Sequence, residues 1–265
     1  MMNDTPATAA DLASLIAAME ATEGEDCLHI PEGWLQGRTA YGGLSAALAL
    51  AAVLRRWDDL PPLRSAQITF IGPVAGRVRI RTELLRRGRS AAFVQADVLS
   101  DEGLGLRATF VFMHPRDSHI DYPARDPDGE VLPAKGEPFA PPAAVAFAQN
   151  FEFRATGAEA PGVPHISRWA RLRGRDGLHP MVELLAVGDV LPPAAMMLFT
   201  KFGPISSMTW QINLLSDRPS TVDGWWLVRA TADHAQQGSS SQHMSIRNAH
   251  GVLVATATQS VALFA

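Results

Sequence analysis

The chain has 265 residues, of which 47% are hydrophobic, and its formal net charge is -4. This length can bury a sizeable core in one large domain or in two domains of ordinary size. The charge balance gives no strongly basic face, so nucleic acid is not an expected partner. Cys27 is the only cysteine, which excludes an intrachain disulfide and a metal site built from several cysteines. No metal or other cofactor is expected.

The first residues predict a short amphipathic helix over 8–20. They carry acidic side chains early and lack a basic n-region, so they do not read as a signal peptide. The most apolar run, Leu44 to Leu54, is too short to span a bilayer and is followed by two arginines. We therefore expect a cytoplasmic protein that has no membrane partner.

The first half of the chain predicts one buried helix followed by a series of strands. Residues 24–40 read as loop or short strand. The Ala- and Leu-rich run from Leu44 to Trp57 is apolar on nearly every side, which is typical of a buried helix. Period-two alternation of apolar and polar residues then indicates half-buried antiparallel strands. The predicted strands are Leu63–Ile71, Arg77–Arg86, Ala91–Ser100 and Leu104–Met113.

Residues 114–142 are rich in Pro, Asp and Gly and have few large apolar side chains, which indicates a connection between domains. We predict an N-terminal domain over 1–120, a linker over 121–142 and a C-terminal domain over 143–265. The second half repeats the order of the first, with a helix predicted over His179–Val190. Its predicted strands are Phe147–Thr156, Ile166–Arg173, Ser206–Leu215, Trp225–Asp233, Ser241–Asn248 and Val252–Phe264.

The two halves read as a diverged duplication. LGLRATFVFM (104–113) and VLVATATQSV (252–261) match in pattern, and each follows a short turn that ends in Gly103 or Gly251. One helix wrapped by a curved antiparallel sheet is the hotdog arrangement, so we predict an α+β fold of two tandem hotdog domains packed side by side. Any all-β protein shows hairpins at similar spacing, but the helix falls at the matching place in both halves.

Four segments resemble the type II acyl-CoA thioesterases, the fused double-hotdog family. YGGLSAALALAA (41–52) is similar to the family's Gly-Gly helix opening, and GDVLPPA (188–194) to the helix end that carries its aspartate. ISSMTWQINLL (205–215) is similar to the hydroxyl-bearing strand, and HGVLVATATQS (250–260) to the closing hairpin. The resemblance covers nearly the whole chain from about residue 23.

The resemblance implies hydrolysis of acyl-CoA by a water molecule held between an aspartate, a hydroxyl and a glutamine. Carried over by position, the catalytic residues are Asp189, Ser207 and Gln259. Ser206 and Thr209 remain alternatives for the hydroxyl. Taken singly, Asp189 also suits a turn cap and Gln259 an exposed strand position.

Substrate-binding residues are expected at the start of the buried helix in the first half and on the hydroxyl-bearing strand. Tyr41, Gly42 and Gly43 open the helix, where backbone N–H groups can stabilise an oxyanion and glycine permits close approach. Thr209 is the fourth expected contact. Strand periodicity puts Ser207, Thr209 and Gln211 on one face, so several polar groups are expected to line one pocket.

The chemistry favours a thioester hydrolase that releases a free carboxylic acid and coenzyme A. Asp189 would accept the proton of water, and burial near a helix end would raise its pKa toward a useful value. Two alternatives stay open on the same fold: a catalytically weak acyl-CoA-binding protein and an enoyl-CoA hydratase. Acyl-CoA is the expected partner, in fatty acid metabolism, and the resemblance implies a homodimer or a higher homo-oligomer.

Overall fold

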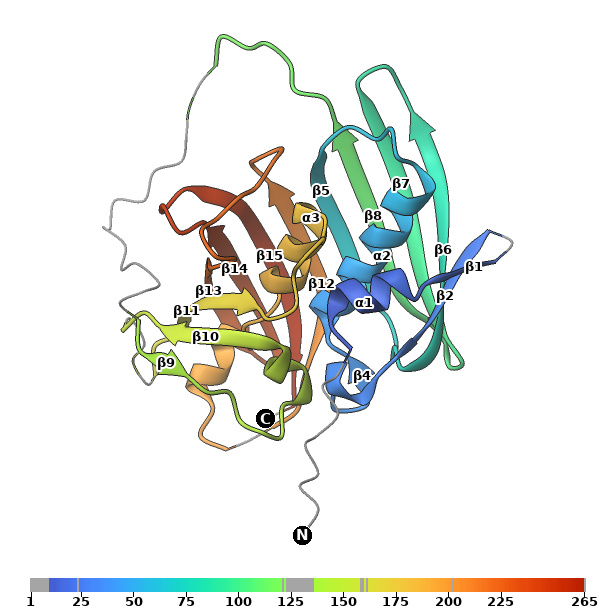
Figure 1. The fold of residues 1–265 in the computed structure, drawn as a ribbon. Coiled ribbons are helices and arrows are strands. Elements are labelled where there is room, and N and C mark those ends of the chain that lie inside the picture. Colours follow the sequence, from blue (N-terminus) through green and yellow to red (C-terminus); the bar gives the residue numbers. More distant parts are fainter. Residues whose placement is uncertain are drawn as a thin grey trace.

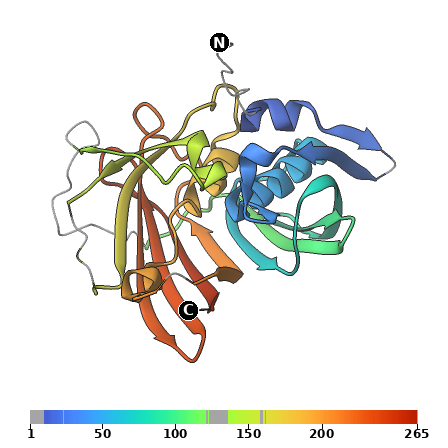
Figure 2. The same cartoon turned by 90° about the horizontal axis from the view of Figure 1, so that it is seen from below.

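The structure, a computed structural model, describes residues 10–22, 24–120, 122, 136–157, 160, 162–201 and 203–264. These residues form a large curved antiparallel sheet with two main helices lying against its inner face (Figure 1). Seen from below, the sheet folds around one helix in each half, and the halves lie side by side (Figure 2). This is the predicted double-hotdog arrangement.

In the thirteen-stranded sheet, the two halves arrange their corresponding strands in nearly the same order, counted from the centre of the sheet outward. It runs β1-β2-β6-β7-β8-β5 in the first half and continues β12-β15-β14-β13-β11-β10-β9 in the second. The halves are joined where β5 pairs with β12, so neither of these strands is an edge. The bounds are β1 Glu20–Thr22, β2 Glu25–Ile30, β5 Leu63–Phe70, β6 Gly76–Arg87, β7 Ala91–Ser100, β8 Gly103–Met113, β9 Pro138–Phe139, β10 Phe151–Ala155, β11 His165–Leu172, β12 Ile205–Leu214, β13 Trp226–Gln236, β14 Ser239–Arg247 and β15 Leu253–Leu263.

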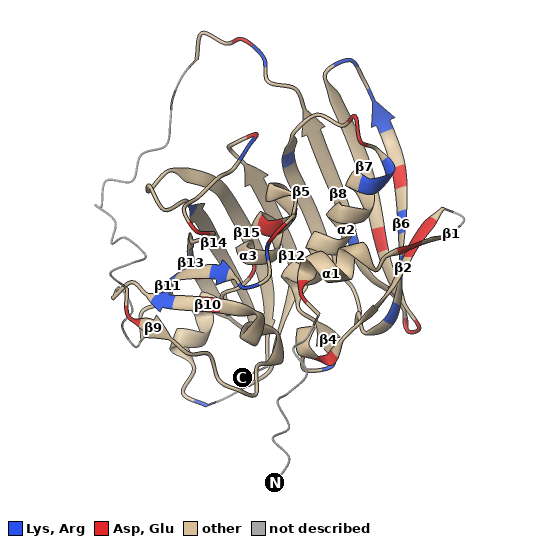
Figure 3. Ribbon diagram, in the orientation of Figure 1, with Lys and Arg blue, Asp and Glu red and all other residues tan. Residues whose placement is uncertain are grey.

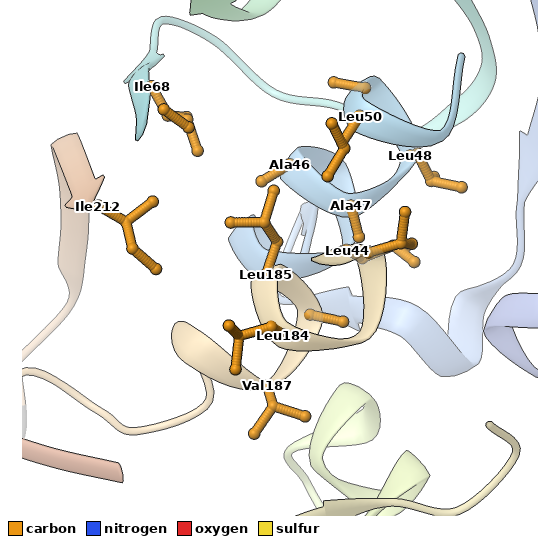
Figure 4. Packing of buried hydrophobic residues seen from close by; sticks show 14 of the residues in the cluster. Leu44, Ala46, Ala47, Leu48, Leu50, Ile68, Leu184, Leu185, Val187 and Ile212 are labelled. Atoms are coloured by element: carbon orange, nitrogen blue, oxygen red, sulfur yellow. The ribbon is translucent and has the colours of Figure 1, made fainter. Parts of the chain in front are cut away.

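The central helices pack against each other and against the middle of the sheet. Helix α2 spans Gly42–Arg56 and is buried continuously from Gly43 to Val53, as its Ala- and Leu-rich sequence predicts. Helix α3 spans Pro180–Gly188 and packs against α2, with Leu185 pointing toward Ala46 (Figure 4). Ile68 of β5 and Ile212 of β12 point at this contact from the sheet. The core is therefore continuous across the two halves.

The predicted alternation of β6 is confirmed. Val78 and Ile80 are buried, whereas Arg79 and Arg81 are exposed on the opposite face. Charged residues of both signs occur along β6 (Figure 3). The inner face is left apolar, as one-sided burial of an antiparallel sheet requires.

Smaller elements complete the fold. Helix α1 (Leu12–Ala17) is shorter than predicted, and its N-cap Asp11 accepts a hydrogen bond from the Ser14 N–H. Short strands β3 (Leu35–Gln36) and β4 (Thr39–Ala40) pair with each other ahead of α2. Among the described residues, 3₁₀ helices are formed by Glu32–Trp34, Ala146–Asn150 and Ala194–Leu198.

The strand predicted over Phe147–Thr156 is wrong in its first residues, because β10 begins only at Phe151. The Phe147 ring instead stacks on Tyr41, with ring centroids 4.2 Å apart, within the 3₁₀ helix that precedes β10. This tertiary contact outweighs the local strand pattern. Residue 121 and residues 123–135 of the predicted linker lie outside the described part of the chain, so the predicted domain boundaries stay a prediction.

Among the described residues, no helix has the length and apolar character needed to cross a membrane.

Candidate active site

The Asp189 carboxylate lies where the end of α3 meets the start of α2. Helix α3 ends at Gly188, and Asp189 is its C-cap residue. A Cβ on Gly188 would lie 3.1 Å from the Trp210 ring and 3.0 Å from Ile246. Glycine therefore lets the helix end press against the sheet, which fixes where Asp189 emerges.

Asp189 is held by one side chain and one backbone group from distant parts of the sequence. The Gln259 Nε2 of β15 donates to Asp189 Oδ1 at 2.8 Å. The backbone N–H of Gly43, in the first turn of α2, also donates to this carboxylate. A Cβ on Gly42 would lie only 2.6 Å from Asp189 Oδ2. The carboxylate thus sits at the positive end of a 15-residue helix.

The surroundings of Asp189 raise the pKa of its carboxyl toward neutral pH. Burial raises the pKa of the Asp189 carboxyl from 3.8 to about 7, and the hydrogen bonds from Gln259 and Gly43 oppose this rise without cancelling it. Most of the residue is enclosed by protein, while a part stays accessible to solvent. A carboxylate of this kind can take a proton from water near neutral pH, since its pKa is close to the working pH.

The raised pKa predicts how stability depends on pH. Between pH 4 and pH 7 the native state holds a proton on Asp189 that the unfolded chain has lost, so the free energy of unfolding falls as pH rises through this window. Relative to Asp189→Asn, the wild type should lose up to roughly 4 kcal/mol over the interval. Chemical denaturation at a series of pH values measures the difference. Asp217→Asn, at an exposed loop position, is the control and should follow the wild type. Parallel curves for wild type and Asp189→Asn would contradict the assignment.

The register of β12 decides which hydroxyl shares a face with Gln259. Ser207 lies opposite Val261, whereas Thr209 lies opposite Ser260. Directly paired residues share a face and neighbouring residues of one strand do not, so Ser207 and Thr209 face opposite ways. Val261 and Gln259 are both buried on the inner face. Ser207 is therefore on the side of Gln259, and Thr209 is on the exposed outer side.

The expectation that Ser207, Thr209 and Gln211 share a face is wrong. A β-bulge between Ser207 and Thr209 adds one residue, Met208, to β12. The extra residue inverts the alternation, so Thr209 and Gln211 are exposed together on the outer face. Ser206 is also exposed. Within the described chain Ser207 makes no hydrogen bond to Asp189 or Gln259, so its part in the site stays a prediction.

Tyr41 is a buried residue that supports the start of α2. Its hydroxyl donates to the Ala186 carbonyl of α3 at 2.9 Å, and its side chain is 1% exposed. Burial, with the negative charge of Asp189 nearby, raises the pKa of the Tyr41 hydroxyl well above its usual range. Tyr41 thereby ties the start of α2 to α3, and direct contact between Tyr41 and substrate stays a prediction.

One buried polar residue next to the site was missed by the sequence interpretation. Gln242 of β14 is paired with Gln259, and its Nε2 donates to Gln259 Oε1 at 2.6 Å. The signal was available, because Gln242 occupies an inner-face position in line with the buried Met244 and Ile246. A buried glutamine on a mostly apolar face is the exception that calls for a partner.

The first half of the chain does not repeat this site. Matching β-bulges occur in β5, at Arg64, and in β12, at Met208, and they align the two halves. By this alignment the polar sheet positions of the site are apolar and buried in the first half. The equivalents are Leu63 for Ser207, Val94 for Gln242 and Phe110 for Gln259. In the part of the chain that the structure describes, the duplicated fold therefore carries one site of this kind.

Fold and site together define a double-hotdog protein with a buried carboxylate–glutamine pair between its halves. The sequence matches the acyl-CoA thioesterase N-terminal domain over residues 30–113 and the acyl-CoA thioesterase C-terminal domain over residues 124–263. The chain belongs to the acyl-CoA thioesterase family. No curated protein sequence matches it.

Solved structures with the same fold span nearly the whole chain. A conserved hot dog protein of unknown function from Alicyclobacillus acidocaldarius is 22% identical, with a TM-score of 0.83 over 95% of this chain and 97% of that one. An acyl-CoA thioesterase II from Mycobacterium marinum is 17% identical, with a TM-score of 0.74 over 94% and 96%. At these identities the likeness concerns the fold.

Proposed function

We propose that this protein hydrolyses acyl-CoA thioesters to a free carboxylic acid and coenzyme A. The observation that carries the proposal is the Asp189 carboxylate, which has a pKa of about 7 and accepts a hydrogen bond from Gln259 at 2.8 Å. Membership of the acyl-CoA thioesterase family supports the substrate class.

In the proposed reaction Asp189 takes a proton from a water molecule that reaches its open side. The resulting hydroxide attacks the thioester carbonyl carbon and forms a tetrahedral intermediate. When the carbonyl re-forms, the carbon–sulfur bond breaks and coenzyme A leaves as a thiolate, which recovers the proton from Asp189. A general base of this kind contributes roughly 10²–10⁴-fold to the rate.

The neutral groups around Asp189 suit the orientation of water. Gln259 holds one carboxylate oxygen, and Ser207 lies on the same inner face two residue pairs further along β12. The start of α2, with Gly42 and Gly43, supplies the positive end of a helix next to the place where the oxyanion would form. A group that neither gains nor loses charge can position water without competing for its proton.

Release of free thiol from a panel of acyl-CoA substrates tests the proposal. Turnover of at least one of them that disappears in Asp189→Asn is the expected result. Binding without turnover, unchanged by that substitution, would favour an acyl-CoA-binding protein. A change in the absorbance of an enoyl-CoA without thiol release would favour a hydratase.

Ser207→Ala is expected to lower kcat about tenfold, because one neutral group that orients water is removed. Steady-state kinetics with the best acyl-CoA measures the effect. Ser260→Ala, on the outer face of the neighbouring strand, is the matched control and should behave as the wild type. A loss confined to Thr209→Val or Ser206→Ala would assign the hydroxyl to another residue.

A cytoplasmic location, a role in fatty acid metabolism and a homo-oligomeric state stay predictions.

A further inference from the structure

A directional chain of hydrogen bonds leads from a backbone N–H to the proposed base. The Ala194 N–H donates to Gln242 Oε1 at 2.9 Å. Gln242 Nε2 donates to Gln259 Oε1 at 2.6 Å, and Gln259 Nε2 donates to Asp189 Oδ1 at 2.8 Å. The chain crosses from the 3₁₀ helix after α3, through two neighbouring strands, and returns to the end of α3.

The direction of this chain is set at its far end. A backbone N–H can only donate, so the oxygen of Gln242 must face Ala194 and its nitrogen must face Gln259. Gln259 is then obliged to present its oxygen to Gln242 and its nitrogen to Asp189. Without Gln242, the Gln259 amide could rotate by half a turn and present its oxygen to the protonated form of the Asp189 carboxyl, which can donate.

Burial makes the alternative arrangement costly. Gln242 is 1% exposed and Gln259 is 4% exposed, so water cannot readily replace a lost partner. The equivalent pair in the first half is Val94 opposite Phe110, which shows that this position of the fold does not require a polar residue. The amide of Gln242 is therefore specific to the half that carries Asp189.

We propose that Gln242 is a positioning residue that fixes the orientation of the Gln259 amide and thereby keeps an N–H group directed at Asp189. The inference rests on the proposed function in that Asp189 is taken as the base. Gln242 itself contacts neither the carboxylate nor, on this proposal, the substrate.

Two substitutions at Gln242 separate orientation from packing. Gln242→Met keeps the volume and removes both hydrogen bonds. Gln242→Glu keeps the shape and can still accept from Ala194, but the ionised carboxylate cannot donate to Gln259. If orientation matters, the isosteric glutamate is as harmful as methionine or worse at high pH. If only shape matters, glutamate is the milder change. Met244→Leu, on the same face of β14, is the matched control.

For Gln242→Met we expect kcat to fall about tenfold with little change in KM. The acid limb of the pH–rate profile should move upward by roughly half a pH unit to one, because the ionised base loses an oriented donor. Gln242→Glu should lose more activity as the introduced carboxyl ionises. Met244→Leu should match the wild type in both readouts.

A direct titration keeps the test independent of turnover. Isotope-edited infrared spectroscopy of ¹³C-aspartate-labelled protein follows the Asp189 carboxyl, which is assigned by its absence in Asp189→Asn. The carboxyl should titrate at higher pH in Gln242→Met than in wild type. An unchanged titration and pH profile, even with reduced activity or stability, would overturn the proposal. If Gln242→Met shifts the titration of the Asp189 carboxyl but the wild-type protein turns over no acyl-CoA, the proposed function alone is overturned.

Discussion

Asp189→Asn is expected to reduce kcat/KM for acyl-CoA hydrolysis by roughly 10²–10⁴-fold, the contribution of a general base. Asparagine has nearly the same shape and can still accept a hydrogen bond from Gln259, but it cannot take a proton from water. The wild type should show an acid limb near pH 7, where the Asp189 carboxyl ionises. Activity should rise with pH through this limb, because the base acts in its ionised form.

Initial rates of thiol release between pH 5 and pH 9 measure both effects. The residual activity of Asp189→Asn should lack the limb near pH 7. Asp217→Asn makes the same chemical change at an exposed position of the loop after β12 and should leave rate and profile intact. An Asp189→Asn enzyme within about threefold of wild type would show that another group activates the water.

Gly42→Ala is expected to lower kcat on the order of 10²-fold, although alanine favours a helix. The added Cβ would lie 2.6 Å from Asp189 Oδ2 and 2.9 Å from the Phe70 ring, closer than such atoms approach. The carboxylate must therefore move, and a displacement of about 1 Å can cost about 10²-fold in rate. Overpacking costs about 1–3 kcal/mol of stability, which the gain of about 1 kcal/mol in helix propensity partly offsets.

Activity should consequently fall far more than stability, which distinguishes displacement of the base from unfolding. Kinetics and chemical denaturation on the same preparations measure the two effects. Gly88→Ala, where the nearest atom to the added Cβ is 3.7 Å away, is the control and should keep full activity. Wild-type kcat in Gly42→Ala would show that Asp189 tolerates displacement or does not act as the base.

The two predictions and the inference on Gln242 concern different sides of one carboxylate. Gly42 limits the space on the side of α2, and Gln259 holds the side of the sheet. Gln242 donates a hydrogen bond to Gln259 on the side away from Asp189. Because these residues come from elements far apart in the sequence, each substitution disturbs the base by a different physical route.

A comparison of sequence patterns between the two halves does not give the correct equivalent of Gln259. Aligning LGLRATFVFM with VLVATATQSV by pattern places Gln259 opposite Val111 in the repeat. The bulges and strand pairing place it opposite Phe110 instead. A shift of one residue in a strand exchanges the inner and outer faces. Only the register shows that the equivalent of Gln259 is Phe110, buried on the inner face, and not the partly exposed Val111.

The sequence by itself determined the order of elements and the fold class. Apolar runs with helical composition predicted α2 and α3, and alternation predicted the strands to within a few residues, because these signals arise from neighbours along the chain. It also singled out Asp189 and Gln259 through the family resemblance.

Tertiary structure alone decided what surrounds Asp189. The bulge at Met208 separated Ser207 from Thr209, and strand pairing set Gln242 beside Gln259. The pKa of Asp189 also depends on burial by two helices and on donors more than sixty residues away. Local pattern does not encode these contacts, since they exist only once distant segments pack against one another.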